Sequence, residues 1–182
     1  MRPSPDRKLV LMGLRASGKS TLARAAAEAW DVAWADLDDL TLSEAGRETV
    51  REVFERDGEA AFRAAEVRAL RAALGSAELA VLALGGGTPT APGAAELLAV
   101  ERDAGGAVLV YLRVQPGVLA DRLRGLRVER DANRPALTAG SDAAAEVERL
   151  FHDRDPLYQS LATHTLEDVD TLETALAALD RL

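Results

Sequence analysis

A short stretch near the N-terminus has the residue types and spacing that hold a row of phosphate groups. Gly13-Leu14-Arg15-Ala16-Ser17-Gly18-Lys19-Ser20-Thr21 matches G-x-x-x-x-G-K-[ST] and lies between an apolar run and a helix-forming segment. Backbone N–H groups of such a loop bind phosphate oxygens, and the N-terminus of the following helix favours negative charge. We expect a nucleoside-triphosphate site made by Ala16, Ser17, Gly18, Lys19, Ser20 and Thr21. A glycine-rich turn that binds nothing is the alternative, and the flanking elements count against it.

Two acidic side chains follow the next apolar segment, residues 32–35. Asp36 and Asp38 are two positions apart, so in extended chain their carboxylates point the same way. One can hold Mg²⁺, together with the Ser20 hydroxyl, while the other accepts a hydrogen bond from a substrate hydroxyl or acts as a general base. The simpler alternative is an acidic turn that caps the next helix, and Asp39 is a candidate for that cap.

Three consecutive glycines, Gly85, Gly86 and Gly87, follow the apolar run 79–84. Without side chains they allow a ligand to approach the backbone and offer N–H donors to it. Ligands of parallel α/β sheets bind beyond the carboxyl ends of the strands, where this cluster, the phosphate loop and the Asp pair all fall. A flexible turn is the alternative interpretation.

Arginines supply nearly all the positive charge: the 22 basic residues include only two lysines, Lys8 and Lys19. Arg63, Arg134 and Arg154 each lie in a distinctive short segment, and a guanidinium group binds carboxylate or phosphate through two parallel hydrogen bonds. For any single arginine in so arginine-rich a chain, a solvated surface charge is the alternative.

The elements that would position these groups alternate between strand and helix. Such an order predicts one α/β domain over 1–182, with a parallel sheet covered by helices on both faces and no linker or internal repeat. The apolar runs predict strands, and helical spacing predicts the remaining elements. Strands are expected near 9–12, 32–35, 79–84, 107–112 and 163–166, and helices near 21–28, 49–58, 59–74, 92–102, 116–124, 141–152 and 171–182. The helix at 141–152 is interrupted before Pro156, and its resumption through Tyr158 and Leu161 is left open. The polar segment 125–137 is expected to be a mobile surface segment.

The overall composition excludes several classes of function. A formal net charge of −8 argues against general binding to nucleic acid or to anionic membranes, which require a basic face. The chain has no cysteine, so disulfides, thiolate metal sites and cysteine nucleophiles are excluded, and a reducing cytoplasm is the expected location. No apolar run approaches the length of a membrane span.

Taken together, these motifs resemble the shikimate kinases. The phosphate loop, Asp36-Leu37-Asp38, residues 58–66, the triple glycine, Arg134-Pro135 and residues 154–158 come in the order and approximate spacing of that family. The resemblance implies a three-layer phosphate-loop kinase fold, with a five-stranded parallel sheet in the order 2-3-1-4-5 and a mobile lid at about 125–137. It implies transfer of the ATP γ-phosphate to the 3-hydroxyl of shikimate, on the route to chorismate, by a monomeric enzyme.

The resemblance also implies roles for residues around the acceptor. Asp38 would bind shikimate hydroxyls and help to deprotonate the attacking one. Arg63 and Arg154 would hold the shikimate carboxylate, and the Gly85–Gly87 backbone would contact the same substrate.

On the nucleotide side, the resemblance makes Lys19 a catalytic residue, with Arg134 closing over the transferring phosphate from the lid. Ser20 and Asp36 would bind Mg²⁺. Arg122 or Arg127 would be a second nucleotide-contacting arginine, and we favour Arg122. Residues 167–171, where an adenine-contacting loop is expected, match too weakly to assign.

Two other functions fit part of the pattern. A dephospho-coenzyme A kinase also combines a phosphate loop with Asp-x-Asp, but it would not account for Arg63, the triple glycine and Arg154 together. A nucleotide-dependent switch module without catalysis needs neither a hydroxyl acceptor such as Asp38 nor a carboxylate clamp such as Arg154.

Overall fold

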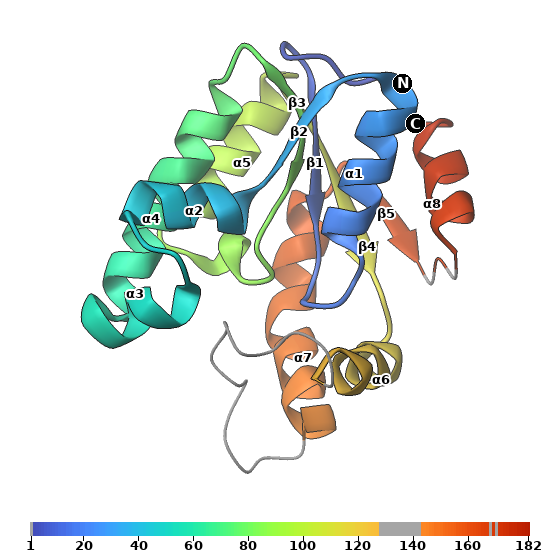
Figure 1. The fold of residues 1–182 in the computed structure, drawn as a ribbon. Coiled ribbons are helices and arrows are strands. Elements are labelled where there is room, and N and C mark those ends of the chain that lie inside the picture. The colour runs from blue at the N-terminus through green and yellow to red at the C-terminus, as the bar shows by residue number, and fades with distance from the viewer. Residues whose placement is uncertain (1, 128–142, 168, 170) are drawn as a thin grey trace.

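A parallel five-stranded sheet forms the centre of the molecule, seen here in a computed structural model that describes residues 2–127, 143–167, 169 and 171–182. The strands lie in the order β2-β3-β1-β4-β5, as expected, and each neighbouring pair is parallel. Their bounds are β1 (Lys8–Met12), β2 (Ala33–Asp36), β3 (Leu79–Ala83), β4 (Ala107–Arg113) and β5 (His164–Glu167). All carboxyl ends therefore meet at one edge, the lower edge in Figure 1.

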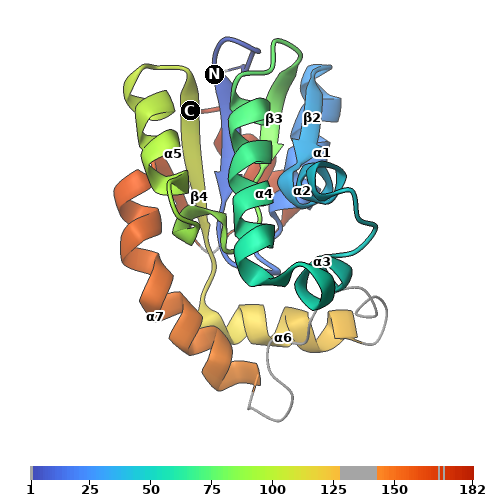
Figure 2. The ribbon, with the colours of Figure 1, turned by 90° about the vertical axis from the view of Figure 1, so that its left-hand side faces the viewer.

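Helices cover both faces of this sheet, which gives three layers. Their bounds are α1 (Lys19–Trp30), α2 (Leu37–Ala45), α3 (Val50–Arg56), α4 (Gly58–Leu74), α5 (Ala94–Asp103), α6 (Pro116–Arg127), α7 (Ala143–Leu161) and α8 (Leu172–Leu179), with a 3₁₀ turn at Thr88–Thr90. Helices α1 and α8 lie on one face, and α4, α5 and α7 lie on the other (Figures 1 and 2). Helices α3 and α6 extend beyond the carboxyl edge of the sheet (Figure 2).

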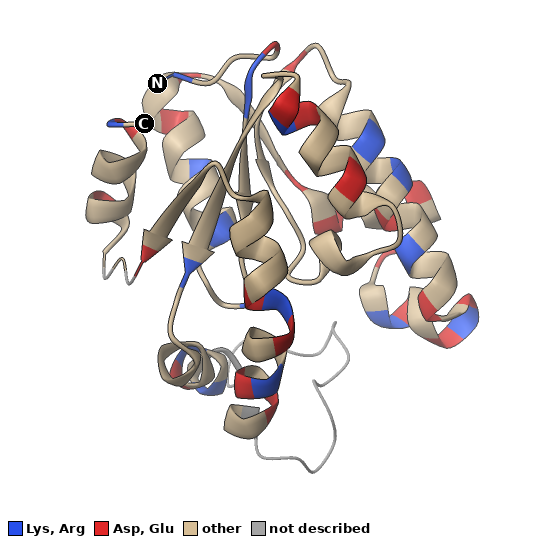
Figure 3. Ribbon diagram, turned by 180° about the vertical axis from the view of Figure 1, so that it is seen from behind, with Lys and Arg blue, Asp and Glu red and all other residues tan. Residues whose placement is uncertain are grey.

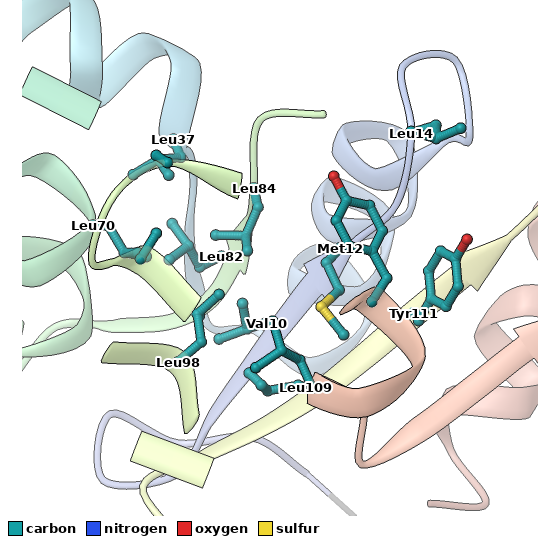
Figure 4. Close-up of a cluster of buried hydrophobic side chains, with 14 of the residues drawn as sticks. Val10, Met12, Leu14, Leu37, Leu70, Leu82, Leu84, Leu98, Leu109 and Tyr111 are labelled. Carbon is teal, nitrogen blue, oxygen red and sulfur yellow. The ribbon is translucent and has the colours of Figure 1, made fainter. Parts of the chain in front are cut away.

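The core divides into two layers because successive strand residues point to opposite faces. Val10 and Met12 of β1 pack with Leu82, Leu109 and Tyr111 in the larger cluster (Figure 4), whereas Leu9 and Leu11 pack with residues of α1 and α8. The three central strands β1, β3 and β4 are apolar along most of their length, and Figure 3 shows the charged residues of the sheet at the ends of its strands. This rigid apolar sheet holds the loops at its carboxyl edge in place.

Two expectations about helices were wrong. Helix α2 was not predicted: its first residues were interpreted as the end of a strand, although Asp36 ends β2 and caps α2. Helix α7 was expected to be interrupted before Pro156, with its resumption through Tyr158 and Leu161 left open, yet it runs through that proline as one continuous helix to Leu161. Tertiary hydrogen bonds on both sides of Pro156, described below, stabilise the turn that the proline weakens.

Of the predicted lid, 125–137, residues 128–137 lie outside the described part of the structure, and Arg134 lies there with them. In the residues that are described, no helix is both long and apolar enough to cross a membrane.

Candidate active site

The phosphate loop links β1 to α1 and leaves its N–H groups at the carboxyl edge of the sheet. Gly18 adopts a left-handed φ of 96°, which a glycine accepts without strain, and it begins α1. The buried Lys19 side chain turns back over the loop, where its Nζ donates to the Leu14 carbonyl at 2.9 Å. The loop therefore combines a helix N-terminus with a buried ammonium group, as a site for phosphate requires.

Asp36 lies beside the start of α1 and connects it to α2. Its carboxylate accepts a hydrogen bond from the Ser20 hydroxyl, and its Oδ1 accepts the backbone N–H of Asp38 at 3.0 Å. Asp36 therefore caps the N-terminus of α2, whereas the sequence had suggested Asp39, which is exposed, for that cap. Asp38 lies in the first helical turn, so the extended geometry expected for the pair is wrong, although both side chains line the same pocket.

The triple glycine is the point where three parts of the site come together. A Cβ atom on Gly85 would lie 2.6 Å from Asp38 Oδ1, and one on Gly86 would lie 2.9 Å from the backbone nitrogen of Arg15 in the phosphate loop. A Cβ atom on Gly87 would lie 3.2 Å from Arg63 Nη1 and 3.5 Å from Arg154 Nη1. A side chain at position 86 would collide with backbone, whereas at positions 85 and 87 it would press on the functional ends of Asp38 and Arg63, so each of the three glycines leaves space that the site uses.

Arg63 is held by a buried carboxylate. Its Nη1 donates to Glu66 Oε2 at 2.9 Å, and Glu66 Oε1 accepts the Thr88 hydroxyl at 2.6 Å. Glu66 is 2% exposed, so its charge is compensated within the protein. Sequence analysis did not assign Glu66 or Thr88; the only signal was the i, i+3 spacing of Arg63 and Glu66 on one helix.

Arg154 reaches the triple glycine from α7. Its Nη1 donates to the Gly86 carbonyl at 2.9 Å, and Tyr158, one turn later, donates its hydroxyl to the same oxygen at 2.7 Å. Tyr158 is fully buried, and burial raises the pKa of its hydroxyl to about 12. Arg154 bonds a neutral carbonyl here, whereas Arg63 pairs with a carboxylate, so Arg154 contributes more uncompensated positive charge to the site.

These groups line one pocket of about 360 Å³. Four cationic side chains face it, those of Arg15, Lys19, Arg63 and Arg154, against the carboxylates of Asp36 and Asp38. The pocket is therefore locally positive in a chain whose net charge is −8. Figure 3 shows acidic and basic residues mixed along the helices, so the concentration of arginine is a property of the pocket.

A second pocket, of about 510 Å³, lies on the other side of the phosphate loop. Its walls are mainly apolar and come from β4, β5, α8 and the residues that follow the two strands, among them Leu112, Val114, Leu166, Val169 and Leu172. Ala16, Gly18 and Thr21 line both pockets. This apolar pocket includes residues from the segment 167–171 that sequence analysis left unassigned.

Arg122 of α6 lies at this second pocket and donates from Nη1 to the Ala16 carbonyl at 3.3 Å. That position agrees with the preference for Arg122 over Arg127 as the second nucleotide arginine. Arg127 is the last residue of α6, and its side chain lies outside the described part of the structure.

A phosphate loop between an arginine-lined pocket and an apolar pocket, on a sheet of this order, defines a phosphate-loop kinase that acts on a small molecule. The family model described as "Shikimate kinase" matches residues 15–180. A shikimate kinase of Mycobacterium avium is 40% identical over 156 residues, which cover 86% of this chain and 81% of the relative. The chain therefore belongs to the shikimate kinase family.

Solved structures agree with this assignment. A shikimate kinase from Acinetobacter baumannii in complex with shikimate superposes with a TM-score of 0.80 and 29% identity, covering 100% of this chain and 92% of that one. A shikimate kinase from Bacteroides thetaiotaomicron gives a TM-score of 0.78 at 27% identity, with 96% of each chain covered. The predicted fold and family are both confirmed.

Proposed function

We propose that this chain transfers the γ-phosphate of ATP to the 3-hydroxyl of shikimate, with the acceptor in the arginine-lined pocket. The observation that carries the proposal is the convergence of Asp38, Arg63 and Arg154 on the triple glycine. A small acid with several hydroxyls needs a cationic clamp at one end and a hydrogen-bond acceptor at the other, and here the clamp lies at Gly87 and the acceptor at Gly85, two positions apart. Family membership supports the same reaction.

We place the shikimate carboxylate against Arg154 and Arg63. Both guanidinium groups lie within 3.5 Å of one point at Gly87, so they can bind a carboxylate there together. Asp38, beside Gly85, then faces the hydroxyl end of the ring. Its carboxylate accepts the proton of the attacking hydroxyl as the bond from the acceptor oxygen to the γ-phosphorus forms and the bond from the γ-phosphorus to the bridging oxygen breaks, which releases ADP.

We place the triphosphate on the N–H groups of residues 16–21 and the adenine base in the apolar pocket. Lys19, now bonded to Leu14, supplies an ammonium group that neutralises charge on the transferring phosphoryl group. Arg122 lines the apolar pocket, on the other side of the phosphate loop from Lys19, and binds the nucleotide from there. Phosphoryl transfer depends mainly on such positioning and charge neutralisation.

The residues present also fit a magnesium ion. Ser20 and Asp36 offer hydroxyl and carboxylate oxygens, the hard ligands that Mg²⁺ prefers, at the start of α1. No cluster of three potential metal-ligating His, Cys, Asp or Glu side chains occurs among the described residues. This suits an ion that takes most of its ligands from phosphate and water. Held by Ser20 and Asp36, Mg²⁺ would supply positive charge that neutralises the phosphate oxygens during the transfer.

Arg134 and its closure over the transferring phosphate stay a prediction from the sequence, as do the monomeric state and the cytoplasmic location.

Release of ADP by the purified chain tests the proposal. With Mg²⁺ and ATP, shikimate should raise ADP release far above the rate without an acceptor, whereas dephospho-coenzyme A, quinate and gluconate should give little. Rapid turnover of another acceptor and none of shikimate would overturn the assignment. Nucleotide binding without turnover of any acceptor would favour a switch module instead.

A further inference from the structure

A polar network on the far side of Arg154 fixes the turn of α7 that carries it. Asp155 accepts hydrogen bonds from Arg113 Nε at 2.9 Å and Arg113 Nη2 at 3.1 Å, a two-pronged contact between β4 and α7. Its Oδ1 also accepts the Tyr111 hydroxyl at 2.9 Å, and Gln159 donates to its Oδ2 at 2.7 Å. These bonds connect the core strand β4 directly to the residue next to Arg154.

The same network reaches the triple glycine by a second route. The ring of Tyr111 packs edge-on against that of Tyr158, with centroids 5.4 Å apart and planes at 86°. Tyr158 in turn donates to the Gly86 carbonyl, the oxygen that also accepts from Arg154. Tyr111 and Tyr158 are both buried, so little room remains for either ring to move independently.

Helix α7 requires such support because Pro156 lies inside it. A proline has no N–H, so the helical bond to the carbonyl of His152 cannot form, and an interior proline disfavours a helix by about 3 kcal/mol. Asp155 is the residue immediately before this weak point, and Arg154 is the one before that. Contacts from β4 therefore hold the turn where the helical backbone itself holds it least.

We propose that Asp155 and Arg113 form a positioning pair that aims the Arg154 guanidinium at the acceptor. The inference rests on the proposed function, because the acceptor is taken to be shikimate. Neither residue lines the arginine-lined pocket. They act through Arg154, holding its helical turn at a fixed distance from Gly86, so that the guanidinium meets the acceptor carboxylate without paying for reorientation.

Steady-state kinetics of Asp155→Asn, Arg113→Gln and the double variant test this pair. Each single variant should raise the KM for shikimate about tenfold, equivalent to about 1.4 kcal/mol, with the KM for ATP changed less than twofold. The effect of the double variant on this KM should be smaller than the sum of the two single effects, because both remove the contact between Arg113 and Asp155, whereas the pair of Arg113 with Glu167 is lost only with Arg113. Calorimetric titration with shikimate should show the same loss of affinity.

Arg102→Gln is the matched control. Arg102 of α5 donates to the carbonyls of Ser160 and Leu161 at 2.9 and 3.0 Å, so it also anchors α7, but at the end away from Arg154. This variant should lose thermal stability while the KM for shikimate stays within twofold of the wild type. If Asp155→Asn does not fold, Arg113→Lys, which keeps the charge but not the two-pronged contact, provides the same comparison.

An unchanged KM for shikimate in folded Asp155→Asn or Arg113→Lys would overturn the inference. So would an equal rise in the KM values for ATP and shikimate, which indicates a general structural role. Failure of the wild type to phosphorylate shikimate would instead overturn the proposed function, so the two failures are distinguishable.

Discussion

Arg63 on α4 and Arg154 on α7 bring their guanidinium groups to the same point, the place that a Cβ atom would take on Gly87. The two residues come from opposite halves of the chain and are supported differently, Arg63 by the buried Glu66 and Arg154 by the Gly86 carbonyl. Since like charges repel, this arrangement is stable only with negative charge nearby. Glu66 supplies part of that charge, and the acceptor carboxylate is proposed to supply the rest.

Arg154→Ala should raise the KM for shikimate by about 100-fold, because a charge-assisted contact worth about 1.5–3 kcal/mol is lost. The KM for ATP should change less than threefold. Arg68→Ala removes an exposed α4 arginine that pairs with Glu44, and it should leave both constants unchanged. An equal rise in both KM values for Arg154→Ala would indicate that Arg154 is structural.

Asp38→Asn should lower kcat by about 10²–10⁴-fold, the usual contribution of a general base, while shikimate still binds through the arginines. Single-turnover experiments with radiolabelled ATP would separate this chemical step from product release. Asp39→Asn, at the neighbouring exposed position, is the control and should retain wild-type turnover. Near-normal kcat for Asp38→Asn would remove its role as base.

Gly87→Ala should weaken shikimate binding without unfolding the chain. The new methyl group would lie 3.2 Å from Arg63 Nη1, so that guanidinium group must shift by a few tenths of an ångström, and it would also contact Arg154 Nη1 at 3.5 Å, where the acceptor carboxylate is proposed to bind. We expect the KM for shikimate to rise about tenfold, about 1.4 kcal/mol. At Gly117 of α6 a Cβ atom would meet nothing within 4 Å, so Gly117→Ala should be neutral or stabilising. An equal KM for shikimate in Gly87→Ala and Gly117→Ala would contradict the proposal that the acceptor binds at Gly87.

The pKa of Tyr158 predicts a specific loss of stability in alkali. Burial raises it to about 12, against an ordinary value of 10.0, so above pH 10 the unfolded chain loses this proton while the folded one retains it. The contribution of Tyr158 to the free energy of unfolding is therefore fully present below pH 10 and declines as the pH rises towards about 12. Urea unfolding at several pH values should show this slope, and Tyr158→Phe should flatten it. Burial and the hydrogen bond to Asp155 also raise the pKa of Tyr111. The Tyr158→Phe variant should therefore still lose some stability as the pH rises above 10.

The order of the sheet and many of the residues that line the arginine-lined pocket could be predicted from the sequence, because both depend on local signals. Apolar runs marked the strands, and the phosphate loop, Asp38 and the triple glycine are recognisable from residue type and spacing. Helix α2 was missed because Asp36 belongs both to the end of a strand and to a helix cap.

Contacts between distant parts of the chain carried no such signal. Nothing near Glu66 in the sequence indicates Thr88, and nothing near Arg113 indicates Asp155, since each pair forms only when the sheet brings two segments together. The continuation of α7 through Pro156 likewise depends on contacts with distant segments of the chain. Its stability comes from β4 and from Gly86, which lie far from it along the chain.

At Gly86 the main chain touches the main chain of Arg15, with no side chain in between. The triple glycine and the phosphate loop therefore lie backbone against backbone, and a residue larger than glycine at position 86 would push the two loops apart. A descendant of this chain that adopts a new acceptor would have to alter the side chains that line the pocket, while this contact between the two loops is inherited.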